Sequence, residues 1–175
     1  LTKLQKAICT FHGAKKLRLY FKDAIFNFDD TQSSLVYIDG MFAHSGLLNI
    51  PSLLSKKPLT GLTNARGVFS NILPEGEGEG YSSADRYTRI TADFFKNTTA
   101  IQYISDSASV AGNTVFQNSS GSIPGFGGIF ANIPNLLLEV GCFSKLASLK
   151  EVNRAIFTGS IADADSGTYS KYNTR

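Results

Sequence analysis

The stretch 17–27 alternates between apolar and polar side chains more regularly than any other part of the chain. Leu17, Leu19 and Phe21 fall on one side of this pattern, and Arg18 lies between them on the other. Successive side chains of a strand point to opposite faces, so the pattern predicts an extended segment with one buried face. Asp23 continues the apolar positions, and a carboxylate there needs a partner, a raised pKa or a wet cavity.

Short apolar stretches recur along the chain and are separated by glycine, proline, asparagine and aspartate. We expect strands at 16–26, 34–38, 67–72, 87–95, 99–105, 113–117, 128–132, 136–143 and 154–161. Only 2–9 and 144–152 have the pattern of helices, and no repeat of fixed period is visible. This order predicts an all-β fold with short flanking helices. An antiparallel barrel is the first expectation and a β-sandwich or jelly roll is the alternative.

The length of 175 residues fits a single domain with a sizeable core. We expect an N-terminal segment at 1–15, the barrel at 16–161 and a polar tail at 162–175. A net charge of +3 is too small to indicate binding to nucleic acid. No apolar run reaches the ~18–20 residues that a membrane span requires.

Two sequons and two cysteines bear on the compartment. The sequons begin at Asn97 and Asn118, and they predict glycosylation in a secretory protein. Cys9 and Cys142 either form a disulfide that closes most of the domain or stay as two free thiols. We therefore expect a secreted or lumenal protein.

Most familiar catalytic and metal-binding motifs are missing from the sequence, so we expect no metal and no organic cofactor. Ionisable residues on apolar strands are the remaining candidates: Asp23, Arg66, Arg154 and Glu139. If several of them converge inside a barrel, they form the polar floor of a small-molecule pocket. If each lies at a strand end, it meets water or forms a structural ion pair.

The sequence resembles plant dirigent proteins and allene oxide cyclases in short patches that follow one another in order. In the first patch, Tyr20-Phe21-Lys22-Asp23, Lys22 stands where dirigent proteins have His. The other patches are 35–40, 64–69, 94–99 and 123–130. The resemblance implies an eight-stranded antiparallel barrel, commonly trimeric, with an apolar cavity and no cofactor, and it assigns the pocket carboxylate to Asp23. The Arg-Gly of the dirigent pattern is absent after 123–130.

These observations lead to two functional hypotheses. In the first, the barrel binds an apolar, partly oxygenated small molecule and guides its cyclisation or radical coupling. Asp23 is then a hydrogen-bond acceptor or the general base, and Arg66 or Arg154 the electrostatic partner. The ligand-binding wall consists of Leu17, Leu19, Phe21, Phe69, Phe94, Phe130 and Glu139. In the second, the chain is a non-enzymatic structural subunit of an extracellular or capsid-like assembly. A homo-oligomer or larger assembly is expected in either case. A cavity reaching Asp23 favours the first, and a filled core the second.

Overall fold

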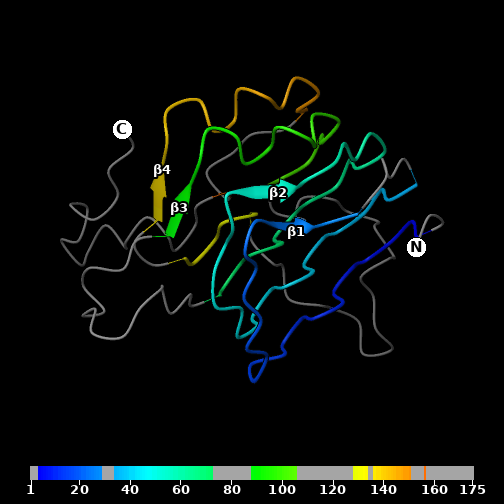
Figure 1. The fold of residues 1–175 in the computed structure, drawn as a ribbon. Coiled ribbons are helices and arrows are strands. Elements are labelled where there is room, and N and C mark those ends of the chain that lie inside the picture. The colour runs from blue at the N-terminus through cyan, green and yellow to red at the C-terminus, as the bar shows by residue number, and fades with distance from the viewer. Residues whose placement is uncertain are drawn as a thin grey trace.

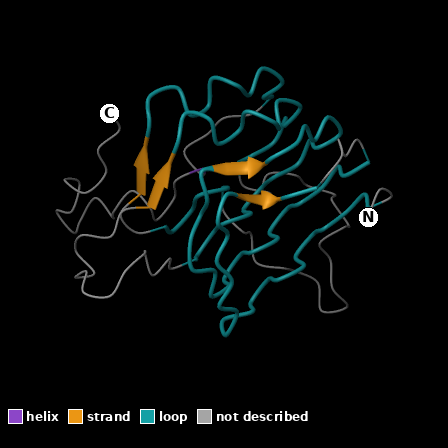
Figure 2. Cartoon of the chain, viewed as in Figure 1, coloured by secondary structure: helices purple, strands orange, loops and turns teal. Residues whose placement is uncertain are grey.

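The computed structural model describes residues 4–28, 34–72, 88–105, 128–133, 136–150 and 156. Within them lie the short strands β1 (Ala24–Phe26), β2 (Leu53–Ser55), β3 (Thr88–Ile90) and β4 (Leu136–Leu138). β1 pairs with β2 and β3 with β4, and both pairs are parallel. The rest of the described chain is turns and extended segments (Figure 2).

Segments far apart in sequence lie side by side and form hydrogen bonds at equivalent positions, so the described chain is a stack of parallel units. Val36 N–H donates to the Gln5 carbonyl (2.9 Å), Thr63 N–H to the Val36 carbonyl (3.0 Å), Gln102 N–H to the Thr63 carbonyl (2.8 Å), and Lys150 N–H to the Gln102 carbonyl (2.9 Å). We call the successive units rungs. Figure 1 shows their blue, cyan and green segments running alongside one another.

Rung 1 comprises 4–28 and rung 2 comprises 34–59. Rung 3 comprises 63–72 with 88–98, and rung 4 comprises 101–105, 128–133 and 136–146. Each rung has two sides. The turn row contains 5–13, 36–44, 63–71 and 128–132, and the strand row contains 19–28, 48–59, 88–98 and 136–143. Residues 149, 150 and 156 belong to the start of a fifth rung, where Phe130 N–H donates to the Ile156 carbonyl (3.2 Å).

A five-residue turn motif with phenylalanine at its centre builds the turn row. It occurs at 9–13, 40–44, 67–71 and 128–132, with Phe11, Phe42, Phe69 and Phe130 in third place. The fifth residues all have positive φ: Gly13 (70°), His44 (56°), Asn71 (57°) and Asn132 (56°). Glycine, asparagine and histidine tolerate this conformation better than most residues, and it suits the third position of a tight turn. The motif therefore turns the chain at the same place in each rung.

The phenylalanines of this motif stack directly on one another through the molecule. Ring centroids lie 5.3 Å apart for Phe11 and Phe42, 6.3 Å for Phe42 and Phe69, and 6.1 Å for Phe69 and Phe130, with nearly parallel planes. Phe94 from the strand row meets Phe69 edge to face at 6.1 Å. The two rows thus enclose a core that aromatic rings fill.

Gly46 connects the two rows of rung 2 at a point of close approach to rung 1. Its N–H donates to the Ala14 carbonyl (3.1 Å). A Cβ at this position would collide with the Lys15 carbonyl oxygen and would lie 2.6 Å from that of Leu17. Only glycine fits here, which explains one of the glycines that the sequence places between apolar stretches.

The expected antiparallel barrel is wrong, and so is the alternative antiparallel sandwich. All strand pairings in the described residues are parallel, and they form no closed barrel. Alternation of apolar residues reports which face of an extended segment is buried, because successive side chains point to opposite faces whether the partner strand is parallel or antiparallel. The hydrogen-bonding partner of each segment lies one rung away and not across a hairpin.

The expected flanking helices are also wrong where the chain is described. Lys6 forms a parallel bridge with Tyr37. Residues 144–149 form successive tight turns, with Leu146 N–H donating to Phe143 and Leu149 N–H to Leu146. Over the described ranges, no helix is long and apolar enough to cross a membrane.

Candidate functional site

A buried ion pair between rungs 2 and 3 is the most unusual polar feature of the described structure. Asp39 is 1% exposed and Arg66 is 4% exposed. The Arg66 backbone N–H donates to Asp39 Oδ1 (2.8 Å), and Arg66 Nη1 lies 3.8 Å from the same oxygen. Asp39 immediately precedes Gly40, and Arg66 precedes Gly67. The two charged residues therefore occupy the same position, directly before the turn motif, in neighbouring rungs.

An aromatic ring from rung 4 extends this pair. The Arg66 guanidinium carbon lies 4.3 Å from the centre of the Tyr103 ring, and Lys150 Nζ lies 5.9 Å from the same ring. A guanidinium over an aromatic face is attracted by the ring quadrupole, most strongly where water is excluded. Arg66 Nε is buried and has no hydrogen-bond partner among the described residues. The cluster therefore links three consecutive rungs but leaves one donor unsatisfied.

Burial dominates the electrostatics of this cluster. It raises the pKa of Asp39 to about 6, while the hydrogen bond and charge of Arg66 lower it. Burial also raises the pKa of the Cys9 thiol to about 11, and the nearby Asp39 charge adds to that shift. Cys9 N–H donates to the Asp39 carbonyl (3.0 Å), so rung 1 covers the pair from its other side.

This arrangement suits a structural role better than a chemical one. Both charged side chains are nearly inaccessible, and a general base must reach its substrate within hydrogen-bonding distance. A buried pair contributes little net stability because desolvation opposes the attraction, but removing one partner strands a buried charge. In some proteins such groups select a single register. A slip between rungs 2 and 3 would separate Asp39 from Arg66 and leave both charges buried without a partner, so the pair opposes such a slip.

Asp23 lies on the surface and not among the apolar side chains, so its expected orientation is wrong. Its carboxylate contacts Lys56 Nζ at 2.8 Å, and half of the side chain is exposed. The hydrogen bond and charge of Lys56 lower its pKa. The alternation is correct through Phe21, where the side chain of Asn49 hydrogen-bonds both the N–H (2.8 Å) and the carbonyl (2.7 Å). The chain then bends before β1, which moves Asp23 outward.

The phenylalanines expected to line a ligand pocket contact one another. Phe69 and Phe94 are 0% and 1% exposed, and Phe130 is 0% exposed. Leu17, Leu19 and Phe21 are half-buried and pack on the same core from rung 1. These side chains form the interior of the stack.

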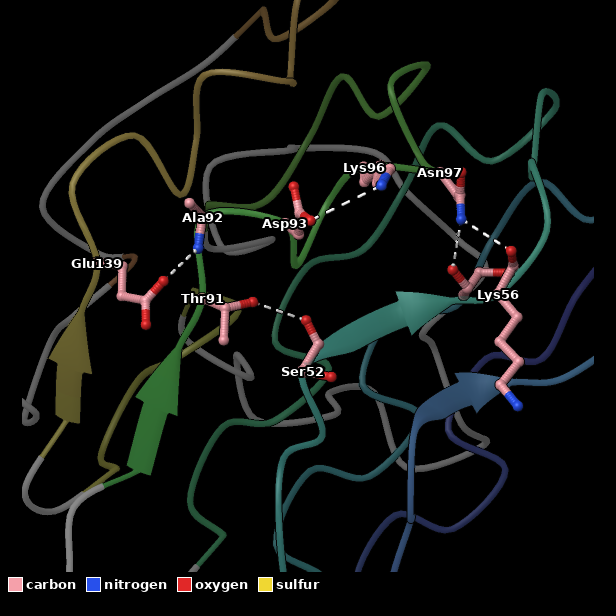
Figure 3. A network of polar contacts seen from close by, with 9 residues as sticks. Ser52, Lys56, Thr91, Ala92, Asp93, Lys96, Asn97 and Glu139 are labelled. Carbon is pink, nitrogen blue, oxygen red and sulfur yellow. Dashed lines mark hydrogen bonds and ion pairs between the residues drawn. The ribbon is translucent and has the colours of Figure 1, made fainter.

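Glu139 joins a polar network on the strand row instead of lining a pocket with Asp23 (Figure 3). Its carboxylate accepts hydrogen bonds from Ala92 N–H (3.0 Å) and Arg89 Nη1 (3.3 Å), which lower its pKa. Thr91 Oγ1 donates to the Ser52 carbonyl (2.8 Å) in the same network. These contacts run from rung 4 through rung 3 to rung 2, so they join neighbouring rungs along the strand row.

The first sequon lies in this network, and the second lies outside the described residues, as does Arg154. Asn97 Nδ2 donates to the carbonyls of Ser55 (3.0 Å) and Lys56 (2.9 Å). A glycan linked to that nitrogen would remove one of these bonds, because linkage uses one of its two hydrogens.

The disulfide considered for the two cysteines is not formed in the structure. Both are free thiols, with Cys9 half-buried and Cys142 buried. Cys9 belongs to the turn row of rung 1 and Cys142 to the strand row of rung 4, so two rungs separate them. Burial raises the pKa of Cys142 to about 11, which disfavours its thiolate.

A shallow, open hollow of about 340 Å³ lies beside the turn that follows β4. It is lined by consecutive residues from Leu138 to Ser144, including Glu139 and the 81% exposed Val140. It contains neither Arg66 nor Asp23. In the described part of the chain, no three His, Cys, Asp or Glu side chains gather closely enough to bind a metal ion.

Sequence reasoning missed Asp39, Tyr103 and a row of polar side chains along the turn motif. The His12 and His44 rings lie 5.4 Å apart, His44 Nε2 lies 3.3 Å from Asn71 Nδ2, and Asn132 Nδ2 donates to Asn71 Oδ1 (2.7 Å). The available signal was the recurrence of Gly-x-Phe-x followed by His or Asn. Its intervals are irregular, so a search for a fixed period does not find it.

Comparisons with protein-family models, with curated proteins and with solved structures find no match. The resemblance to dirigent proteins and allene oxide cyclases therefore stays a prediction from short patches, and the barrel that it implies differs from the observed stack.

Proposed function

We propose that this chain is a non-enzymatic structural module, a rigid stack of rungs that serves within a larger assembly. The observation that carries the proposal is the filled core. Phe42, Phe69, Phe94 and Phe130 are each at most 1% exposed and contact one another in a row, so packed side chains occupy the described core around them.

The separation of the candidate catalytic residues also supports a non-enzymatic, structural role. Asp23 lies on the surface of rung 1 with Lys56, and Arg66 lies inside rung 3 with Asp39. Acid–base catalysis needs its groups around one reacting centre. These residues instead join neighbouring rungs, as do Thr91, Asn97 and Glu139 on the strand row.

The experiment asks whether the folded chain takes up apolar, oxygenated small molecules. A panel of phenolic alcohols and an environment-sensitive apolar dye are titrated by calorimetry and fluorescence, and the unfolding midpoint is recorded with each. We expect no saturable binding and no shift in the midpoint, because the core has no room. Saturable one-site binding that Phe69→Leu weakens, while a variant at the exposed Tyr20 does not, would overturn the proposal.

The extracellular location is part of this proposal and depends on the sequons alone. Mass spectrometry of the protein secreted from eukaryotic cells tests it at Asn97 and Asn118. A glycan at either residue supports the secretory route. Full-length protein that enters the secretory pathway with both asparagines unmodified removes the basis for it.

A further inference from the structure

Among the described residues, the partly buried apolar side chains that pack against the core cluster come from the two ends of the stack. In rung 1 these are Leu4, Phe11, Leu17, Leu19, Phe21 and Phe28. Leu138, Phe143 and Leu149 are their counterparts in rung 4 and at the start of rung 5. Phe42 and Phe69 in the middle rungs are 0% exposed. Phe11 stacks on Phe42 at 5.3 Å, and it is the last ring of this row among the described residues.

The backbone of the turn row has a direction. Cys9 N–H donates to the Asp39 carbonyl, Gly40 N–H to the Arg66 carbonyl, and Phe69 N–H to the Ile129 carbonyl. Over 7–13 and the equivalent positions of the later rungs, the amides therefore point to the next rung in sequence and the carbonyls between them point back, whereas at the start of the row Val36 N–H points back to the Gln5 carbonyl. In an ordinary strand edge, donors and acceptors alternate.

Rung 1 consequently presents carbonyls at its outer edge. Lys6, Ile8 and Thr10 occupy the positions of Tyr37, Asp39 and Met41 in rung 2, whose carbonyls accept amides from rung 1. No donor in the described residues reaches the carbonyls of Lys6, Ile8 and Thr10. The outer edge of rung 1 thus combines aligned acceptors with the exposed face of the terminal ring.

We propose that rung 1 is a docking surface for one more parallel rung, supplied by a partner polypeptide that carries the same Phe-centred turn motif. The proposal rests on the structural function proposed above. The partner places its phenylalanine over Phe11 and donates its amides to the carbonyls of Lys6, Ile8 and Thr10. The contact repeats the one between rungs 1 and 2.

The same polarity argues against another occupant. Two copies of this chain cannot join symmetrically through rung 1, because both would bring carbonyls to the shared edge. The occupant must offer donors to the carbonyls of Lys6, Ile8 and Thr10, and a rung with this motif does so at the positions of Ile38, Gly40 and Phe42.

A peptide corresponding to 36–62 supplies the probe, because it spans one full rung from the position of Gln5 to the residue before the next such position. It is titrated into the full chain. We expect saturable one-to-one binding, with slowed hydrogen exchange at the peptide amides of Ile38, Gly40 and Phe42. A peptide with Phe42→Asp leaves the protein unaltered and should bind more than about tenfold more weakly, since it loses the ring stack.

A covalent version removes dependence on peptide affinity. Residues 36–62 are duplicated directly ahead of Gln5, so that the added rung joins rung 1 with the native spacing. We expect a higher unfolding midpoint and slower hydrogen exchange at the added amides. When the added copy carries Phe42→Asp, we expect neither effect. An added rung that stays unprotected overturns the inference. So does equal binding of the two peptides, or a dimer of the parent chain formed through rung 1 that the peptide does not displace. None of these outcomes alters the small-molecule test of the proposed function.

Discussion

The two aspartates Asp23 and Asp39 each pair with a cation on a neighbouring rung, but in opposite environments. Asp23 meets Lys56 at the surface of the strand row, where half of its side chain is exposed and its pKa is lowered. Asp39 meets Arg66 inside the turn row, where burial raises its pKa to about 6. The alternating pattern of the sequence singles out the first carboxylate, whereas the second is the one that the fold buries.

The difference follows from desolvation. An exposed pair exchanges hydration for a contact of similar strength, so its net contribution is small. A buried pair has already lost its hydration, and each charge depends on the other. The two pairs should therefore respond differently when one partner is removed, when Asp39 is titrated, and when the surface carboxylate of Asp23 is neutralised.

Removing the buried cation should have the largest effect. Arg66→Met leaves Asp39 without its counter-charge and should destabilise the fold by about 3–5 kcal/mol, measured by urea unfolding. The matched change at the surface, Lys56→Met, should leave the unfolding midpoint close to that of the parent. The double variant Asp39→Asn with Arg66→Met should recover most of the loss, because no charge is left stranded and the amide oxygen still accepts the Arg66 N–H. Equal effects of Arg66→Met and Lys56→Met would refute the distinction between the two pairs.

The buried pair should also show itself in the pH dependence of stability. The pKa of Asp39 is about 6 when folded and near its ordinary value of 3.8 when unfolded, so between these values the folded state holds the extra proton. The contribution of Asp39 to the free energy of unfolding is therefore fully present below pH ~4. It is lost as the pH rises through about 6, and above that pH it stays constant. The fall amounts to at most about 3 kcal/mol.

The measurement is the unfolding free energy of the parent minus that of Asp39→Asn, followed from pH 4 to 8. Because the asparagine does not titrate, the difference isolates Asp39 from the surface carboxylates, whose lowered pKa values act in the opposite direction. A flat difference, or one that increases with pH, would contradict the burial of a charged Asp39.

Neutralising the surface carboxylate should have the smallest effect. Asp23→Asn removes the ion pair with Lys56 but leaves no buried charge, so the unfolding midpoint should stay unchanged across neutral pH. The same variant should alter no small-molecule binding, since the side chain faces solvent. A large loss of stability, or the loss of a bound ligand, would restore Asp23 to the role that the sequence pattern suggested.

The sequence predicted local burial correctly and the long-range pairing incorrectly. The alternation of Leu17, Leu19 and Phe21 with exposed neighbours is confirmed, because a strand exposes its faces whatever its partner. The prediction of a barrel was wrong because equivalent segments recur at irregular intervals along the sequence, with 73–87 and 106–127 between some of them. Nothing in a single alternating stretch specifies which distant segment it pairs with.

The buried pair was missed for a related reason. Asp39-Gly40 is a common turn dipeptide, and Arg66 stood before a predicted strand, so neither pattern placed the two together. Their proximity comes from the register of rungs 2 and 3, which the turn motif sets. Aligning the Phe-centred motifs at 40–44 and 67–71 brings Asp39 and Arg66 to the same position, and the sequence contains that signal.

A disulfide between engineered cysteines tests the central claim, the parallel stacking of rungs, most directly. Arg89 of β3 is the register partner of Leu137 in β4. With Cys9→Ser and Cys142→Ala as background, Arg89→Cys and Leu137→Cys should oxidise to a disulfide, because partners on adjacent strands lie within its span. Arg89→Cys with Ser105→Cys in the same background is the comparison variant, since an antiparallel hairpin over 87–105 would place residue 105 opposite Arg89. Peptide mapping should find the 89–137 link in the first variant and no 89–105 link in the second. The reverse result would contradict the stack.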